Sequence, residues 1–332
     1  MNSLFTPSSK ELSELFTRVE DAHDPRLAHQ VQRIEAPFGS FLEEAKAGDV
    51  VMLGYPDDRG VERNGGRTGA FAGPDLIRKF LFRLTPSYSA KALPKIYDLG
   101  NLKTWSQDLL VSHEEARGCI KSLRQKGVRL ITLGGGHDWA YPDFVDFAES
   151  HPTRKARVIN VDAHLDVRPE PKDDARQGNS GTPFRRILSL QSQKIPEILA
   201  LGLQETCNAK SHVDWAQSRH VTTLFLEELP ENAERRWPFV VDRLQLSAPN
   251  ACYGLSIDLD VFPQFVSPGV SAPQVFGIDP SLVYKMMRTL GSNIEHLGIY
   301  EYNPSFDIDA RSARLAAHLI YTYLVTLSQS SK

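Results

Sequence analysis

The chain has 332 residues, of which 41% are hydrophobic and 24% charged, so it holds enough apolar material for a large core. Lys plus Arg number 38 and Asp plus Glu number 41, and the formal net charge of −3 argues against attraction to nucleic acid or to an anionic membrane. The three cysteines are odd in number and lack metal-like spacing, which fits a reducing compartment. The sequence shows neither a signal peptide nor a membrane span, so we expect a cytoplasmic protein.

Residues 1–49 are polar and charge-mixed, and we interpret them as a lead-in that is helical in places, over 9–20 and 38–47. From residue 50 onward, short runs rich in Val, Ile and Leu alternate with longer amphipathic stretches. The runs predict strands at 50–55, 95–99, 128–133, 156–161, 197–203, 251–257 and 295–299. The stretches predict helices at 74–84, 112–126, 140–149, 208–218, 233–246, 280–290 and 312–327.

The predicted strands are almost continuously hydrophobic, which is typical of a parallel sheet covered by helices on both faces. No linker or charge block interrupts the alternation, so residues 50–332 predict one α/β domain with three layers, α/β/α, around a mostly parallel central sheet. Ligands of such sheets bind beyond the carboxyl ends of the strands. The residues that follow each apolar run are therefore the candidates for a functional site.

Two of these strand ends carry imidazole and carboxylate groups. The run at 128–133 leads into three glycines and His137, and the run at 156–161 leads into Asp162, His164 and Asp166. Residues two apart on an extended segment project to the same side, so the last three side chains form one row. Because close carboxylates repel one another unless a cation lies between them, the row indicates a site for Mn²⁺, Zn²⁺ or Fe²⁺.

Two further strand ends are acidic. Asp258 and Asp260 follow the run at 251–257 with the same spacing, and Glu301 follows the run at 295–299. The four aspartates and two histidines are too many ligands for one Zn²⁺ and suit two metal ions that share carboxylates. We expect Glu301 to accept hydrogen bonds from a cationic group of the substrate.

The motifs Gly-Gly-Gly-His, Asp-Ala-His-x-Asp and Ser-x-Asp-x-Asp, in this order, resemble the ureohydrolase family of arginase, agmatinase and formimidoylglutamase, over roughly residues 50 to 327. The resemblance implies an arginase-like α/β/α domain that binds two Mn²⁺ per subunit. It implies two ligand sets that share Asp162 and Asp258 as bridges: His137, Asp162, Asp166 and Asp258 for one ion, and Asp162, His164, Asp258 and Asp260 for the other.

Within this family the chain looks closest to the formimidoylglutamases. Residues 57–73 and 179–185 look like signatures of that branch, and Ser180 stands where arginases and agmatinases carry histidine. Asp138 and Tyr302 differ from the residues usual in the branch, and both are expected near the pocket. They leave the identity of the substrate open.

The resemblance implies hydrolysis of a linear amidine, N-formimidoyl-L-glutamate and water giving L-glutamate and formamide in histidine degradation, through a hydroxide that bridges two Mn ions. Asp260 would serve as the general acid and base, and Glu301 would orient the amidinium group. The substrate has two carboxylates, so cations or amide donors are expected at the pocket rim. The candidate substrate contacts are Arg63, Asn64, Arg67, Ser180, Asn208 and Glu301.

Two alternatives stay open at this point. One is a ureohydrolase that acts on arginine, agmatine or a guanidino acid and releases urea, and the other is a catalytically silent metal-binding homologue. The expected partner is a small-molecule amidine, without nucleic acid or membrane, and a homo-oligomer is one option for the assembly.

Overall fold

The computed structural model describes residues 4–6, 12, 14–15, 23–87, 93–104, 108–170, 178–191 and 193–330. The helix expected over residues 9–20 lies almost entirely outside this part of the chain. The described residues include all of the predicted strands and every candidate site residue.

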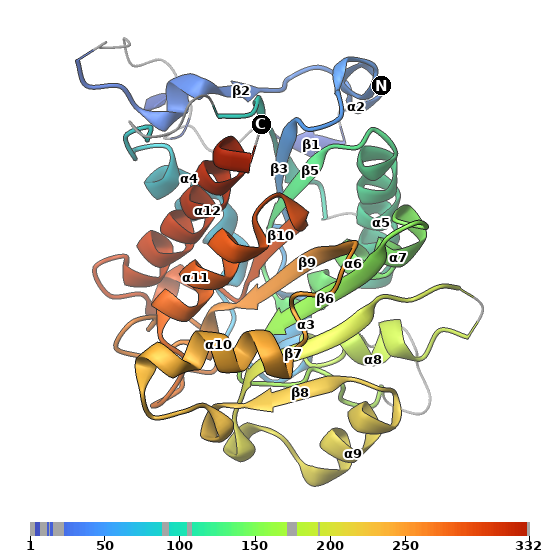
Figure 1. The fold of residues 1–332 in the computed structure, drawn as a ribbon. Coiled ribbons are helices and arrows are strands. Elements are labelled where there is room, and N and C mark those ends of the chain that lie inside the picture. Colours follow the sequence, from blue (N-terminus) through green and yellow to red (C-terminus); the bar gives the residue numbers. More distant parts are fainter. Residues whose placement is uncertain are drawn as a thin grey trace.

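A ten-stranded sheet crosses the centre of the described part of the molecule (Figure 1). Its pairs are all parallel except for the first, which is antiparallel. The order is β1 (Phe5–Thr6), β4 (Ile96–Leu102), β3 (Val50–Gly54), β5 (Arg129–Leu133), β10 (Ile294–Tyr300), β9 (Ala251–Asp258), β6 (Lys155–Val161), β7 (Glu197–Leu203) and β8 (Thr222–Phe225), and β2 (Val31–Arg33) also pairs with β4. All seven strands expected from the sequence are present, whereas β1, β2 and β8 were not predicted.

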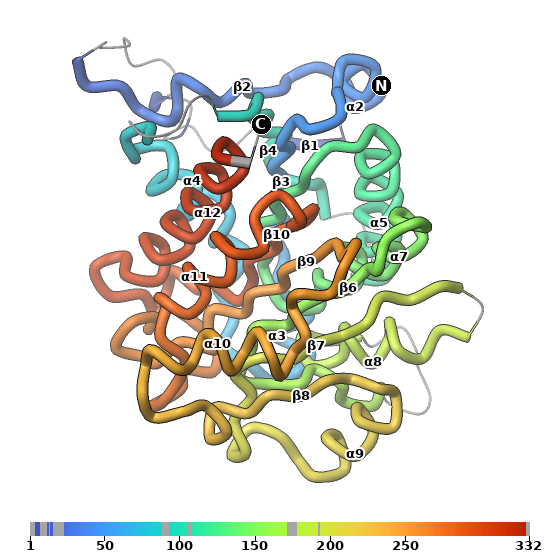
Figure 2. Tube along the Cα trace, viewed as in Figure 1, coloured from blue at the N-terminus to red at the C-terminus, as the bar shows by residue number. Residues whose placement is uncertain are grey.

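Helices cover both faces of the sheet. They are α2 (Phe38–Glu44), α3 (Arg59–Arg63), α4 (Gly73–Leu81), α5 (Leu109–Gln125), α6 (Ala140–Phe144), α7 (Phe147–Ser150), α8 (Pro183–Leu188), α9 (Lys210–Ser218), α10 (Ala233–Arg243), α11 (Pro280–Leu290) and α12 (Arg311–Ser330). Helices α4, α10, α11 and α12 pack together on one face, and α5, α6, α7 and α8 on the other, as Figures 1 and 2 show. The predicted helix at 140–149 is divided into α6 and α7.

The core has two halves, one on each side of the sheet. Val50 and Met52 of β3 belong to the apolar cluster under α4, α11 and α12, whereas Val51 and Leu53 of the same strand belong to the cluster under α5 and α6. All five residues of β3 are buried because its side chains alternate between two covered faces. This arrangement confirms the predicted three-layer α/β/α architecture.

The lead-in adds strands to the edge of the sheet. Val31 pairs with Ile96 in parallel register, and Phe5 pairs with Leu102 in antiparallel register, so β2 and β1 both extend β4. Helix α2 lies within the region expected to be helical at 38–47. The division of the chain at residue 50 stays a prediction.

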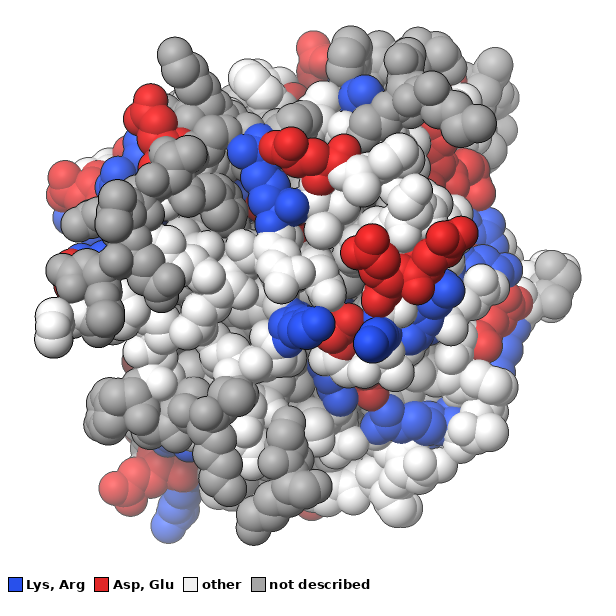
Figure 3. All heavy atoms as spheres, turned by 90° about the horizontal axis from the view of Figure 1, so that it is seen from above, with Lys and Arg blue, Asp and Glu red and all other residues white. Residues whose placement is uncertain are grey.

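Acidic and basic side chains are interspersed on the face at the top of Figure 1, which Figure 3 shows from above. None of the helices in the described part of the chain combines the length and the apolar character needed to cross a bilayer.

Candidate metal centre

The candidate ligands come together because their four strands are neighbours in the sheet. Strands β5, β10, β9 and β6 are consecutive, although β5 and β10 are far apart in the sequence. His137, Glu301, Asp258 and Asp162 lie at or just beyond the carboxyl ends of these four strands, in that order. Parallel pairing places all four ends at the same edge, as the sequence predicted.

The glycine turn after β5 brings His137 into the centre. A Cβ on Gly135 would lie 1.8 Å from the carbonyl oxygen of Asp57, so only glycine allows the two backbones to approach this closely. His137 is 1% exposed, and its Nε2 lies 2.8 Å from the hydroxyl of Ser256. Its ring also stacks on Tyr300, with 4.9 Å between the ring centroids. The imidazole is therefore held from two sides.

The other ring nitrogen of His137 faces a ring of carboxylates. Its Nδ1 lies 3.1 Å from Asp162 Oδ2, 2.8 Å from Asp166 Oδ2 and 3.3 Å from Asp258 Oδ2. It is buried and has no hydrogen-bond partner of acceptable geometry. When Nε2–H donates to Ser256, Nδ1 carries a lone pair, which is the state of a metal-ligating histidine. The donor set therefore fits a divalent cation among these four residues.

A second group of ligand atoms adjoins the first. His164 Nδ1 lies 3.4 Å from Asp162 Oδ1 and 3.2 Å from Asp260 Oδ2. Ligand atoms of Asp162, His164 and Asp260 all lie within 4.8 Å of one another, as do those of the first group. Asp162 belongs to both groups, whereas Asp258 belongs to the first. Asp260 Oδ1 is buried without a hydrogen-bond partner.

Backbone amides fix the orientation of the two aspartates that were expected to bridge. Asp162 Oδ1 accepts a hydrogen bond of 2.7 Å from the amide of His164, and Asp258 Oδ1 accepts one of 2.8 Å from the amide of Asp260. Asn208, expected as a substrate contact, also supports this loop. Its side chain accepts from the amide of Leu165 and donates to the carbonyl of Ala163, both at 2.8 Å.

The carboxylates are crowded in a buried space. Burial, and then the negative charges of Asp260 and Asp162, raise the pKa of Asp258 to about 8. Burial, and then the charge of Asp162, raise the pKa of Asp166 to about 6. The positive charge of a divalent cation offsets this repulsion. The carboxylates can then stay ionised, which is the form in which they bind a metal.

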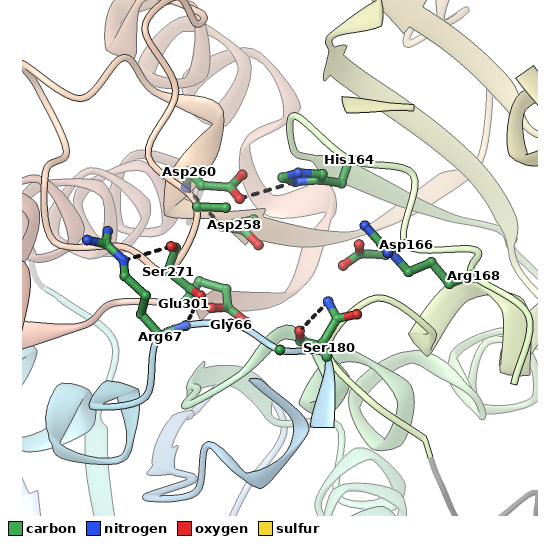
Figure 4. Close-up of a pocket in the computed structure, with 13 residues that line it drawn as sticks. Gly66, Arg67, His164, Asp166, Arg168, Ser180, Asp258, Asp260, Ser271 and Glu301 are labelled. Carbon is green, nitrogen blue, oxygen red and sulfur yellow. Dashed lines mark hydrogen bonds and ion pairs between the residues drawn. The ribbon is translucent and has the colours of Figure 1, made fainter. Parts of the chain in front are cut away.

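A pocket of about 280 Å³ opens onto these carboxylates (Figure 4). Glu301 lines it and is fixed at one end, because Glu301 Oε1 accepts a hydrogen bond of 2.9 Å from the amide of His137. Glu301 Oε2 is buried and has no partner. Burial, and then the charge of Asp258, raise the pKa of Glu301 well above its ordinary value. Asp166 and Glu301 both have left-handed backbone, with φ of 51° and 62°.

The structure separates the predicted substrate contacts into two groups. Asn64, Arg67 and Ser180 line the pocket with Glu301, and Asn64 Nδ2 donates to Ser180 Oγ at 3.1 Å. Arg63 is not among the lining residues, and its guanidinium lies 3.9 Å from the carboxylate of Asp108. Arg168 also lines the pocket, and the sequence analysis did not single it out.

The two residues that depart from the formimidoylglutamase pattern lie behind the pocket. Asp138 is fully buried, and its carboxylate is 2.8 Å from His113 Nε2. Tyr302 is 2% exposed and its ring lies close to Gly73. Neither side chain is among those that line the pocket.

Comparison with known proteins defines the class to which this fold and site belong. The model of the arginase family matches residues 48–326, and the chain belongs to that family. A formimidoylglutamase from Staphylococcus aureus is 31% identical over 311 residues, which cover 92% of this chain and 96% of that protein. A formimidoylglutamase from Rhodococcus jostii is 34% identical over 285 residues, 83% of this chain and 85% of the relative.

A solved structure of Trypanosoma cruzi formiminoglutamase with Mn²⁺ gives a TM-score of 0.76 at 27% identity, covering 92% of this chain and 99% of that chain. The family, the arginase-like fold and the likeness to formimidoylglutamases that the motifs predicted are thereby confirmed.

Proposed function

We propose that the protein hydrolyses N-formimidoyl-L-glutamate to L-glutamate and formamide with two Mn²⁺ per subunit. The observation that carries the proposal is the pair of adjoining ligand groups at the floor of the pocket, where the buried Nδ1 of His137 faces three carboxylates. The relatives named formimidoylglutamase support the substrate, and the Mn²⁺-containing neighbour supports the metal.

The first ion would be held by His137, Asp162, Asp166 and Asp258, and the second by Asp162, His164, Asp258 and Asp260. A pair of divalent ions lowers the pKa of coordinated water, so that a nucleophile strong enough to attack an amidine is available at neutral pH. Nδ1 of His137 and Oδ1 of Asp260 fit the role of metal-ligand atoms, because each is buried without a hydrogen-bond partner.

Glu301 is placed to orient the substrate. Its Oε1 is held by the His137 amide, whereas Oε2 is buried with its lone pairs unused on a side chain that lines the pocket. An amidinium N–H that donates to Oε2 would form a charge-assisted hydrogen bond, and its positive charge would favour the ionised form of Glu301. The formimidoyl carbon is thereby directed toward the aspartates.

Asp260 is placed to handle the proton. Water adds to the formimidoyl carbon, and the bond from this carbon to the glutamate nitrogen then breaks. Asp260 accepts a proton from the attacking water and returns it to the departing nitrogen, as general base and then general acid. This step yields L-glutamate and formamide. We further propose that this reaction serves histidine degradation in the cytoplasm, and the small, odd number of cysteines supports a reducing compartment.

The test is substrate turnover by the purified protein loaded with Mn²⁺. We expect equal amounts of glutamate and formamide from N-formimidoyl-L-glutamate, and loss of this activity after dialysis against a chelator. Urea released from arginine, agmatine or 4-guanidinobutyrate, with no turnover of the formimidoyl substrate, would refute the proposal in favour of a ureohydrolase. A metal-loaded protein inactive on the whole panel would favour a silent homologue.

A further inference from the structure

The charges of the pocket lining pose a problem for an anionic substrate. Four carboxylates line the pocket, from Asp166, Asp258, Asp260 and Glu301, and the arginines in the lining are Arg67 and Arg168. An amidinium group suits the carboxylates, but the two carboxylates of a formimidoylglutamate tail are repelled by them. Binding such a tail requires a cation whose hydrogen-bond donors are available.

Two of the five N–H donors of the Arg67 guanidinium, on Nε and Nη2, are used within the protein. Arg67 Nε donates to the carbonyl of Ser271 at 3.0 Å, and Arg67 Nη2 donates to the carbonyl of Val270 at 2.6 Å. The guanidinium also stacks on Phe306, 3.8 Å from the ring centroid. These contacts fix Arg67 in the pocket wall and occupy its Nε/Nη2 edge, so a bidentate bond to a ligand through that edge would require breaking them.

Arg168 is in the opposite situation. It is exposed, and within the described ranges of the chain its guanidinium makes no ion pair or side-chain hydrogen bond. Figure 4 shows it reaching toward Asp166 on the side of the pocket opposite Arg67. Its position in the sequence, two residues after Asp166, places it beside the metal ligands.

The stem of Arg168 is nevertheless guided by its surroundings. The amide of Arg168 donates to the carbonyl of Gly181 at 2.8 Å. A Cβ on Gly181 would lie 2.7 Å from Arg168 Cδ, 3.0 Å from Arg168 Nε and 3.2 Å from Asn64 Nδ2. The absence of a side chain at Gly181 therefore leaves the space in which the stem of Arg168 lies next to Asn64.

Ser180 supplies a second donor at the same end of the pocket. Its hydroxyl oxygen accepts a hydrogen bond of 3.1 Å from Asn64 Nδ2, so the hydroxyl hydrogen is left to donate (Figure 4). A charged guanidinium and a neutral hydroxyl beside it match the two oxygens of a carboxylate.

We propose that Arg168, assisted by Ser180, binds a carboxylate of the substrate and selects amidines with an anionic tail over those with an ammonium tail. This inference rests on the proposed function and deepens it, because it assigns the substrate class to one pocket residue. An agmatine-like tail would place its ammonium group against the guanidinium, whereas a glutamate tail would pair with it.

The test compares Arg168→Gln with the wild type on two substrates, N-formimidoyl-L-glutamate and N-butylformamidine, whose tail is uncharged. Loss of a charge-assisted bond to a carboxylate should raise KM for the anionic substrate about 10- to 100-fold, with kcat changed less than about threefold. The kinetics on N-butylformamidine and the manganese content should stay at the wild-type level.

Two further variants separate the position of the charge from its presence. Gly181→Ala keeps the Arg168 charge but displaces its stem, and we expect a KM increase of about 3- to 10-fold for the anionic substrate alone. Arg288→Gln removes an exposed arginine on α11 and should behave as the wild type. A KM for Arg168→Gln within twofold of the wild type, or an equal loss on both substrates, would overturn the inference.

A binding measurement makes the inference independent of turnover. Calorimetry with L-glutamate and the Mn²⁺-loaded protein should show binding to the wild type that weakens at least about tenfold in Arg168→Gln. If the wild type fails to hydrolyse N-formimidoyl-L-glutamate but this difference is found, the proposed function is wrong and the carboxylate site stands. Equal glutamate affinity of the two proteins would overturn the carboxylate site.

Discussion

Replacing Ser256 with alanine should weaken manganese binding without unfolding the protein. Ser256 is fully buried in β9, and its hydroxyl lies 2.8 Å from His137 Nε2. In the metal-free variant the imidazole can move its proton to Nδ1, where the carboxylates of Asp162, Asp166 and Asp258 lie 2.8 to 3.3 Å away and stabilise the N–H group electrostatically. The negative charge around Nδ1 therefore offsets much of the cost of burying that N–H group in the metal-free fold.

Metal binding cannot escape the same penalty. A cation at Nδ1 forces the proton back to Nε2, where alanine offers no acceptor. An unpaired buried N–H group costs about 1 to 3 kcal/mol, and loss of a partner behind a metal-ligating histidine typically reduces metal affinity about 10- to 100-fold. We expect a loss in this range for the site that contains His137, and a smaller one for the site that contains His164.

Competition with a chelator measures the two Mn²⁺ affinities, and thermal unfolding of the metal-free protein measures fold stability. Ser328→Ala is the matched control, because Ser328 is also a buried serine and donates to the carbonyl of Val325 in α12. It should keep the wild-type affinities. Unchanged metal affinity in Ser256→Ala, or a loss explained by a lower unfolding temperature of the metal-free variant, would refute the reasoning.

Three other predictions concern the carboxylates. Asp258→Ala should lose most of the bound manganese, measured by elemental analysis after gel filtration, and full retention would contradict its assignment as a ligand. Glu301→Gln should lower kcat/KM at least about 100-fold at unchanged metal content, because it removes the charge of the amidinium acceptor; near-wild-type kinetics would exclude that role. Burial raises the pKa of Asp143 from an ordinary 3.8 to about 6, so the native state holds the proton more tightly than the unfolded chain. As the pH rises from about 4 to about 6, the free energy of unfolding of the metal-free protein should therefore fall, and Asp143 should contribute up to about 3 kcal/mol of that fall. Chemical denaturation at a series of pH values should show a smaller fall in Asp143→Asn.

The strands at the centre of the sheet could be predicted from the sequence because they are buried on both faces. Such strands read as largely apolar runs, as β3, β5 and β9 show, although β6 also carries Lys155, Arg157 and Asn160. Strand β8 was missed because it is short and lies at the edge, where Thr222 is only partly buried. Pairing at an edge depends on the neighbouring strand more than on local sequence.

The metal ligands were predictable for a related reason. The two-residue spacing of the ligands after each apolar run predicts that they project to the same side. The parallel sheet then brings the carboxyl ends of the strands together. The substrate contacts were less predictable, because they depend on which partners are already taken. No feature of the local sequence shows that the Arg63 guanidinium lies near the Asp108 carboxylate. Nor does it show that two backbone carbonyls accept hydrogen bonds from Arg67, while the guanidinium of Arg168 is left to bind a ligand.

The left-handed backbone at Asp166 and Glu301 has a consequence for attempts to make the enzyme more heat-resistant. At both positions glycine would suit the φ angle better than the residue present, so glycine substitutions there relieve backbone strain in the folded state. The same exchanges remove one proposed metal ligand and the proposed amidinium acceptor. A screen that selects for stability alone would favour the change at Asp166, whereas Glu301→Gly also deprives the His137 amide of its acceptor. Because the change at Asp166 removes a proposed metal ligand, such a screen needs turnover as a second criterion.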